Sequence, residues 1–95
     1  MARDAPERIL REARGRTVQV LVANPNSTAA ITEACLELAR AAAAAGTEIV
    51  GWTNQGGPPM IDSVYADYLA GASLAPGLLA VRPRPDAVVL AGFGN

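Results

Sequence analysis

Three short apolar runs alternate along the chain with two longer stretches of helical character. The runs cover residues 17–23, 48–53 and 86–91, and combine β-branched and aliphatic side chains over lengths typical of strands. Runs that are apolar nearly throughout are typical of strands buried on both faces of a parallel sheet. The order strand, helix, strand, helix, strand predicts an α/β fold with right-handed crossovers and a three-layer parallel sheet.

The first helix is expected to begin near Thr28 or Ala29, with Ser27 or Thr28 as its N-cap. Gly46 is placed to end this helix in the left-handed conformation. Four residues recur at helical spacing and predict the face that packs on the sheet: Ile31, Cys35, Leu38 and Ala42. Cys35 is therefore interpreted as a buried structural thiol.

The second helix is expected over residues 63–72, with a break near Pro76 and one more turn at 78–81. A break is expected because proline has no backbone N–H to donate within a helix. Trp52 is interpreted as a packing residue, and so is Tyr65, although its hydroxyl could also face a ligand crevice.

Composition narrows the function classes. The 95 residues include 8 basic and 9 acidic side chains, for a net charge of −1, which excludes nonspecific nucleic-acid binding. One Cys and no His exclude a zinc site of the usual nitrogen and sulfur ligands. No apolar run reaches the roughly 18 residues of a membrane helix. Because the N-terminus is charged where a signal peptide is apolar, we expect a cytoplasmic protein without a membrane partner.

Residues 1–16 hold five of the eight arginines, interspersed with three acidic residues, and are interpreted as a charged, solvated leader. Residues 17–95 form the predicted α/β half-domain. Three strands bury little, whereas a doubly wound domain continues to about five or six. We therefore expect an incomplete half-domain, whose sheet edge is covered by a homo-oligomeric partner or by a C-terminal half.

The turn after the first strand carries the most informative polar side chains. Open parallel sheets place their ligands beyond the carboxyl ends of the strands, which the loops 24–28, 54–61 and 92–95 reach. The first loop combines amides, hydroxyls and the N–H groups of a helix start, a set that suits a carboxylate. The candidate binding residues in it are Asn24, Asn26, Ser27 and Thr28. The alternative is that they only shape the turn and cap the helix.

The second loop, around Gly56 and Gly57, either lets backbone approach a ligand or is a plain connector. Neither this loop nor the turn before it matches a dinucleotide or phosphate-binding glycine motif.

Residues 20–28 read Val-Leu-Val-Ala-Asn-Pro-Asn-Ser-Thr and are followed by Ile-Thr-Glu at 31–33. This opening resembles that of the aspartate/glutamate/hydantoin racemase superfamily, with hydantoin and allantoin racemases as its nearest members. Weaker pieces at 46–50, 57–65, 76–79 and 86–91 fall in the same order, so the resemblance covers residues 17–95.

The resemblance implies one half of a two-domain, pseudo-symmetric fold that binds a small carboxylate or cyclic amide between its halves and uses no cofactor. In this family one Cys from each half flanks the α-carbon of the substrate. One thiolate removes the α-proton, and the other thiol returns a proton to the opposite face. The carbanion is stabilised as an oxyanion, a role that Asn24 and the Ser27–Thr28 turn match.

The third loop departs from the family pattern. The family's first catalytic Cys lies in a stretch that resembles Ala-Cys-Phe-Gly-Asp, whereas residues 91–95 read Ala-Gly-Phe-Gly-Asn. Gly92 and Phe93 remain substrate-binding candidates, but Gly92 cannot be an acid or a base, and Cys35 matches no motif position. The chain therefore carries no predicted catalytic residue.

Two alternatives to a racemase follow from Gly92. One is a decarboxylase of the arylmalonate type, in which loss of CO₂ forms the carbanion and a single thiol elsewhere donates the proton. The other is a non-catalytic carboxylate-binding or interaction module.

Overall fold

The structure, a computed structural model, describes residues 17–92. The predicted leader and Phe93 lie outside the described residues. The elements, in chain order, are β1 (Val18–Asn24), α2 (Ala29–Ala42), β2 (Thr47–Thr53), α3 (Val64–Leu79) and β3 (Ala87–Leu90). This order confirms the predicted alternation of strands and helices.

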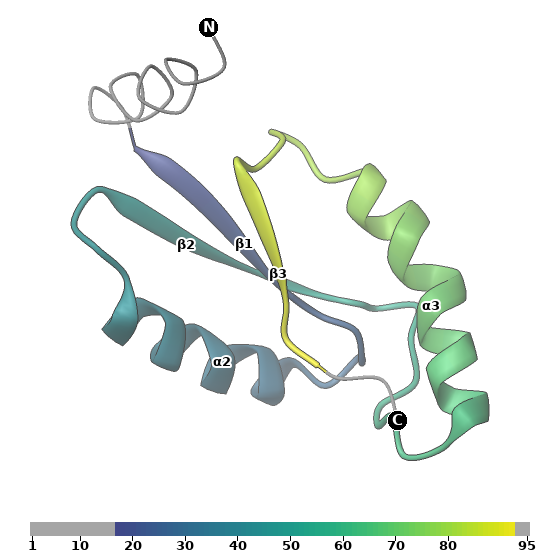
Figure 1. The fold of residues 1–95 in the computed structure, drawn as a ribbon. Coiled ribbons are helices and arrows are strands. Elements are labelled where there is room, and N and C mark those ends of the chain that lie inside the picture. The colour runs from purple at the N-terminus through teal and green to yellow at the C-terminus, as the bar shows by residue number, and fades with distance from the viewer. Residues whose placement is uncertain (1–16, 93–95) are drawn as a thin grey trace, which may run out of the picture.

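The three strands form a parallel sheet in the order β2-β1-β3. Val18 at the start of β1 lies opposite Thr47 of β2, and Ala23 near its end lies opposite Leu90 of β3. The chain leaves β1 towards one neighbour through α2 and crosses to the other neighbour through α3. Right-handed crossovers in these opposite directions place the helices on opposite faces, and Figure 1 shows α2 and α3 on either side of the sheet.

Gly51 and Trp52, which are adjacent in β2, show how closely the two helices pack on the sheet: Gly51 contacts α2 and Trp52 contacts α3. A Cβ at Gly51 would lie 2.7 Å from Cδ1 of Leu36 on α2. A Cβ at Gly77 of α3 would lie 2.6 Å from Cζ2 of Trp52. Successive strand residues point to opposite faces, so these contacts confirm the three-layer arrangement and the packing role predicted for Trp52.

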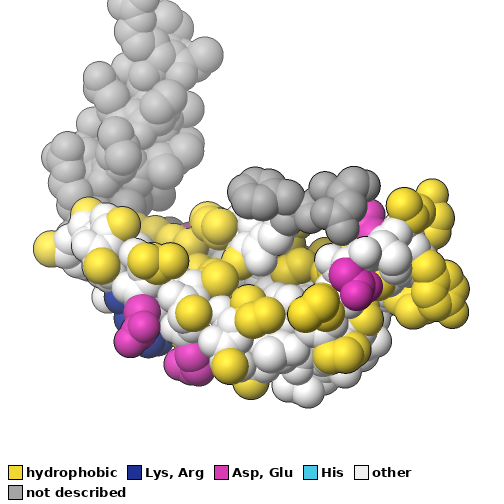
Figure 2. Space-filling view, turned by 90° about the horizontal axis from the view of Figure 1, so that it is seen from below, with side chains coloured by type: hydrophobic (Ala, Val, Ile, Leu, Met, Phe, Trp, Pro, Cys, Tyr) yellow, Lys and Arg dark blue, Asp and Glu magenta, His cyan; other side chains and the backbone are white. Residues whose placement is uncertain are grey.

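The core is centred on β1. Its residues Leu21, Val22 and Ala23 are at most 4% exposed, as expected for a strand covered on both faces. The strand β3 differs, because Val88 and Val89 are each about half exposed. Figure 2 shows further apolar side chains on the surface, with acidic side chains between them.

The helix α2 ends earlier than predicted and presents a different face. It ends at Ala42, and Gly46 adopts its positive φ of 86° in the turn before β2, where its carbonyl accepts a hydrogen bond from Val18. The residues buried on α2 are Thr32 and Leu36.

The prediction of which residues of α2 pack against the sheet is therefore wrong. Ile31 is 39% exposed and Leu38 is 74% exposed, while Cys35 is half-buried. Thr32 faces inward because its hydroxyl lies 3.0 Å from Nδ2 of Asn24 and 2.7 Å from Oγ1 of Thr53. A polar residue at the centre of the packing face is not visible in an apolar periodicity.

The predicted break near Pro76 is also wrong, since α3 runs without interruption from Val64 to Leu79. Pro76 removes one helical hydrogen bond. The residues that follow it are nevertheless held in the helix by hydrogen bonds at its end and by packing against β2. The N–H of Ala80 lies 3.2 Å from the carbonyl oxygens of Pro76 and of Gly77, and Gly77 packs against Trp52.

Candidate functional site

A cleft of about 340 Å³ lies at the carboxyl edge of the sheet. In Figure 1 the strands run towards the side of the molecule on which α3 begins. The carboxyl edge is the position at which open parallel sheets bind their ligands. The lining combines the turn after β1, the loop after β2, one face of α3 and the end of β3: Pro25, Asn26, Met60, Ile61, Asp67, Ala70, Gly71, Leu74, Leu90, Ala91 and Gly92.

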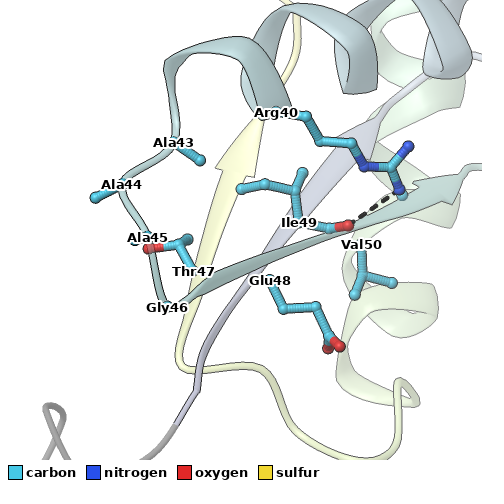
Figure 3. A pocket seen from close by; sticks show the side chains of 10 residues that line it. Arg40, Ala43, Ala44, Ala45, Gly46, Thr47, Glu48, Ile49 and Val50 are labelled. Atoms are coloured by element: carbon cyan, nitrogen blue, oxygen red, sulfur yellow. Dashed lines mark hydrogen bonds between the residues drawn. The ribbon is translucent and has the colours of Figure 1, made fainter.

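A larger and more open hollow of about 690 Å³ lies where α2 ends and β2 begins. Figure 3 shows short alanine side chains at its rim and Arg40 reaching over β2, where Nη2 donates to the carbonyl of Ile49 at 3.2 Å. That contact satisfies a backbone group of a strand with only one neighbour in the described sheet. Because this hollow lies away from the carboxyl ends of the strands, where open parallel sheets bind their ligands, the cleft is the stronger candidate site.

Asn24, the last residue of β1, is fully buried and does not line the cleft. Its Nδ2 lies within hydrogen-bond distance of Oδ1 of Asn26 (2.9 Å), the carbonyl of Thr28 (3.1 Å) and Oγ1 of Thr32 (3.0 Å). Its Oδ1 accepts from the N–H of Asn26 at 3.1 Å. These protein partners engage both ends of the amide, which favours the turn-shaping role over direct contact with a substrate.

The N–H groups of the same turn are used internally as well. Ser27 donates to the carbonyl of Pro58 at 2.9 Å, and Thr28 donates to Oδ1 of Asn26 at 2.9 Å. The hydroxyl of Thr28 donates to the carbonyl of Pro59 at 2.6 Å. These two N–H groups and the Thr28 hydroxyl are therefore engaged within the protein, by the turn itself and by the second loop. Substrate binding by Ser27 and Thr28 stays a prediction.

The helix start also differs from its predicted chemistry. Thr28 is the N-cap residue and α2 begins at Ala29, as expected, but the Thr28 side chain makes no capping hydrogen bond. Its hydroxyl donates instead to the carbonyl of Pro59 in the second loop.

Asn26 and Gly92 are the predicted residues that line the cleft. The Oδ1 atom of Asn26 accepts two hydrogen bonds, and within residues 17–92 its Nδ2 donates to no protein group, which leaves that end for a ligand. A Cβ at Gly92 would lie 2.9 Å from Cγ of Pro25, so a side chain there would press against the proline ring.

Four α3 residues that line the cleft were not predicted as site residues. Asp67, Ala70, Gly71 and Leu74 fall at i, i+3, i+4 and i+7, and this spacing is the signal that could have marked the face. Among the described residues, Asp67 is the one ionisable side chain in the lining. Tyr65, whose hydroxyl was considered for the crevice, is 72% exposed and does not line the cleft.

Other kinds of site find no support in the described part of the chain. No group of three or more His, Cys, Asp or Glu residues within 17–92 could hold a metal ion. In the same range, no helix has the length and apolarity needed to cross a membrane.

Comparison with known proteins identifies related sequences. The family model described as Asp/Glu/Hydantoin racemase matches residues 20–95. The hydantoin racemase of Paenarthrobacter aurescens is 34% identical over 80 residues, covering 82% of this chain and 34% of that protein. The hydantoin racemase of Pseudomonas sp. (strain NS671) is 32% identical over 83 residues, which cover 82% of this chain and 32% of that protein. The chain thus spans about a third of the length of these relatives.

Solved structures show the same relationship. The crystal structure of allantoin racemase from Pseudomonas fluorescens matches with a TM-score of 0.76 and 41% identity, covering 80% of this chain and 32% of that one. Allantoin racemase from Klebsiella pneumoniae matches with a TM-score of 0.75 and 35% identity, and the match covers 81% of this chain and 32% of that one. The α/β arrangement described above is thus shared with one part of these larger structures.

Proposed function

The chain belongs to the Asp/Glu/hydantoin racemase family, and on that premise we propose that it is the N-terminal part of a cofactor-independent enzyme that moves a proton at an α-carbon. The observation that carries the proposal is the cleft at the carboxyl edge. The cleft is lined by Asn26, from the turn that opens the family resemblance, and by Gly92, which the resemblance aligns with the family's first Cys. The substrate would be a small carboxylate or a cyclic amide.

The described residues supply binding groups to such a reaction but not the pair of opposed thiols that the family resemblance implies for proton transfer. Racemisation removes a proton from one face of the α-carbon and returns one to the other, so it needs two opposed acid–base groups. Gly92 has no side chain, and Cys35 on α2 does not line the cleft. We therefore propose that this chain positions the substrate, and that by itself it does not racemise hydantoins, aspartate or glutamate.

Gly92 favours a second candidate, a decarboxylase that needs one thiol. Loss of CO₂ leaves its bonding electrons on the α-carbon, so the carbanion forms without a base at position 92. A single donor then completes the reaction by protonating that carbon. The donor would have to come from outside the described residues.

The proposed function is tested by exchange of an α-proton for deuterium. One enantiomer of a 5-substituted hydantoin is incubated in D₂O with the wild-type chain and with Gly92→Cys, and the C5 proton is followed by NMR. The wild type should show only the uncatalysed exchange rate. Gly92→Cys should exchange faster because one thiolate can remove the proton, even though racemisation needs a second group.

Two controls make the result specific. Gly92→Ser adds a side chain similar in size to Cys but without a thiol. Cys35→Ala, made in both the wild-type chain and the Gly92→Cys variant, removes the native thiol, so that any exchange can be assigned to position 92. If Gly92→Cys exchanges no faster than Gly92→Ser, the cleft is not the site of family chemistry. Loss of optical rotation with the wild-type chain would contradict the expected inactivity.

A further inference from the structure

The cleft at the carboxyl edge carries a negative charge on an otherwise apolar wall. Asp67, in the first turn of α3, is the one ionisable group among the described residues that line it. The side chains of Met60, Ile61 and Leu74 supply apolar surface. The resulting cleft combines much apolar area with few polar groups, as binding sites for small molecules commonly do.

The second polar group in the cleft is a donor. Oδ1 of Asn26 accepts from Nδ2 of Asn24 and from the N–H of Thr28, which fixes the amide with its NH₂ end available. Among the side chains that line the described cleft, Asn26 is therefore the hydrogen-bond donor and the carboxylate of Asp67 is the strong acceptor.

This pair of groups suits a neutral cyclic amide better than a dicarboxylate. A ring that alternates C=O and N–H groups can accept from Asn26 and donate to Asp67 in the same complex. A dicarboxylate has no proton to donate at neutral pH and is repelled by the carboxylate of Asp67. No cationic side chain lines the described cleft to offset this repulsion, and the N–H groups of Ser27 and Thr28 in the neighbouring turn are used internally.

We propose that Asp67 is a specificity-determining residue that makes the cleft select neutral, N–H-bearing cyclic amides over dicarboxylates. The inference rests on the proposed function, because it takes the cleft as the place where substrate binds. It goes further by choosing between the two substrate classes and by assigning the choice to one carboxylate.

The test measures binding selectivity by NMR chemical-shift titration of the ¹⁵N-labelled 95-residue chain. The probes are hydantoin, succinate and aspartate, the last of which adds an ammonium group that Asp67 could attract. Wild type should bind hydantoin more tightly than succinate. Asp67→Asn, which is nearly isosteric, should shift the hydantoin-to-succinate preference by about fivefold towards succinate, the size expected for removing one partly exposed charge interaction.

Two further variants keep the test decisive. Asp67→Ser removes the charge with a different side chain and should shift the preference in the same direction. Asp62→Asn is the matched control, because it removes an equal charge from an exposed residue just before α3 that does not line the cleft. It should leave the preference unchanged.

The outcomes separate this inference from the proposed function. If wild type prefers succinate or aspartate, or if Asp67→Asn changes the preference no more than Asp62→Asn, the role of Asp67 is overturned. Binding of any probe at the cleft would still support the proposed function in that case. If no probe shifts the signals of cleft residues in any form, both are overturned.

Discussion

The side-chain amide of Asn54 donates to the backbone carbonyl of Pro25 at 2.8 Å and so joins the loop after β2 to the turn after β1. Asn54 is 2% exposed, and its Nδ2 also lies 2.9 Å from Oγ of Ser73 and 3.3 Å from the carbonyl of Ala70 on α3. Its backbone N–H donates to the carbonyl of Asn24 at 3.0 Å. One buried residue therefore sets the relative position of three walls of the cleft.

Replacing Asn54 should destabilise the fold more than its size suggests. Asn54→Ala leaves buried carbonyls without a donor, and we expect the free energy of unfolding to fall by about 2 kcal/mol. Urea denaturation followed by circular dichroism measures the change. Ser73→Ala removes a single partner of the same amide and should cost about 1 kcal/mol or less. Equal losses in the two variants would show that Asn54 has no central role.

The two asparagines of the first turn should differ in how much stability is lost when the amide is changed to an acid. In Asn24→Asp an oxygen replaces the buried NH₂ group beside three acceptors, so we expect a loss of about 2–3 kcal/mol in the free energy of unfolding. Asn26→Asp keeps the oxygen that accepts from Thr28, so its stability should change by less than about 1 kcal/mol. Thermal and urea unfolding at neutral pH compare the pair, and a larger loss in Asn26→Asp would contradict the buried geometry of Asn24.

Two glycines of α3 should respond in opposite directions to alanine. Apart from its chain neighbours and the nearby backbone of its own helix, no atom lies within 4 Å of a Cβ built at Gly71, so Gly71→Ala should stabilise the helix by about 0.5–1 kcal/mol. At Gly77 the new Cβ meets the ring of Trp52, and overpacking should cost about 1–3 kcal/mol despite the better helix propensity of alanine. Unfolding followed by Trp52 fluorescence tests both. Stabilisation by Gly77→Ala would mean that the indole moves freely out of the way.

The two helix starts should depend on different contacts. Oγ of Ser63 accepts from the N–H of Ala66 at 3.1 Å, so Ser63→Ala should cost about 1 kcal/mol and speed hydrogen exchange of the Ala66 amide. Thr28→Val is the comparison at the N-cap of α2, where the hydroxyl binds Pro59 rather than the helix. Exchange in the first turn of α2 should stay unchanged in that variant. Faster exchange there would reveal a capping contact.

The apolar run that forms β1 determined much of the fold by its local pattern. Its burial on both faces, its end at the Asn-Pro turn and the parallel order of the strands depend on side-chain types that are adjacent in the chain. The same turn also carried the family resemblance and holds Asn26, which lines the cleft together with Gly92 from beyond β3.

What the sequence determined by itself was the order of strands and helices and the edge of the sheet where the cleft lies, because these follow from local composition and from the geometry of parallel strands. Only the tertiary structure decided that Thr32 faces the sheet, that α3 continues through Pro76, and that Asp67 borders the cleft. Those features depend on partners that lie far along the chain, as Asn54 and Pro25 do across 29 positions. Hydrogen bonds and packing between such partners exist only once the elements are assembled, so no local pattern records them.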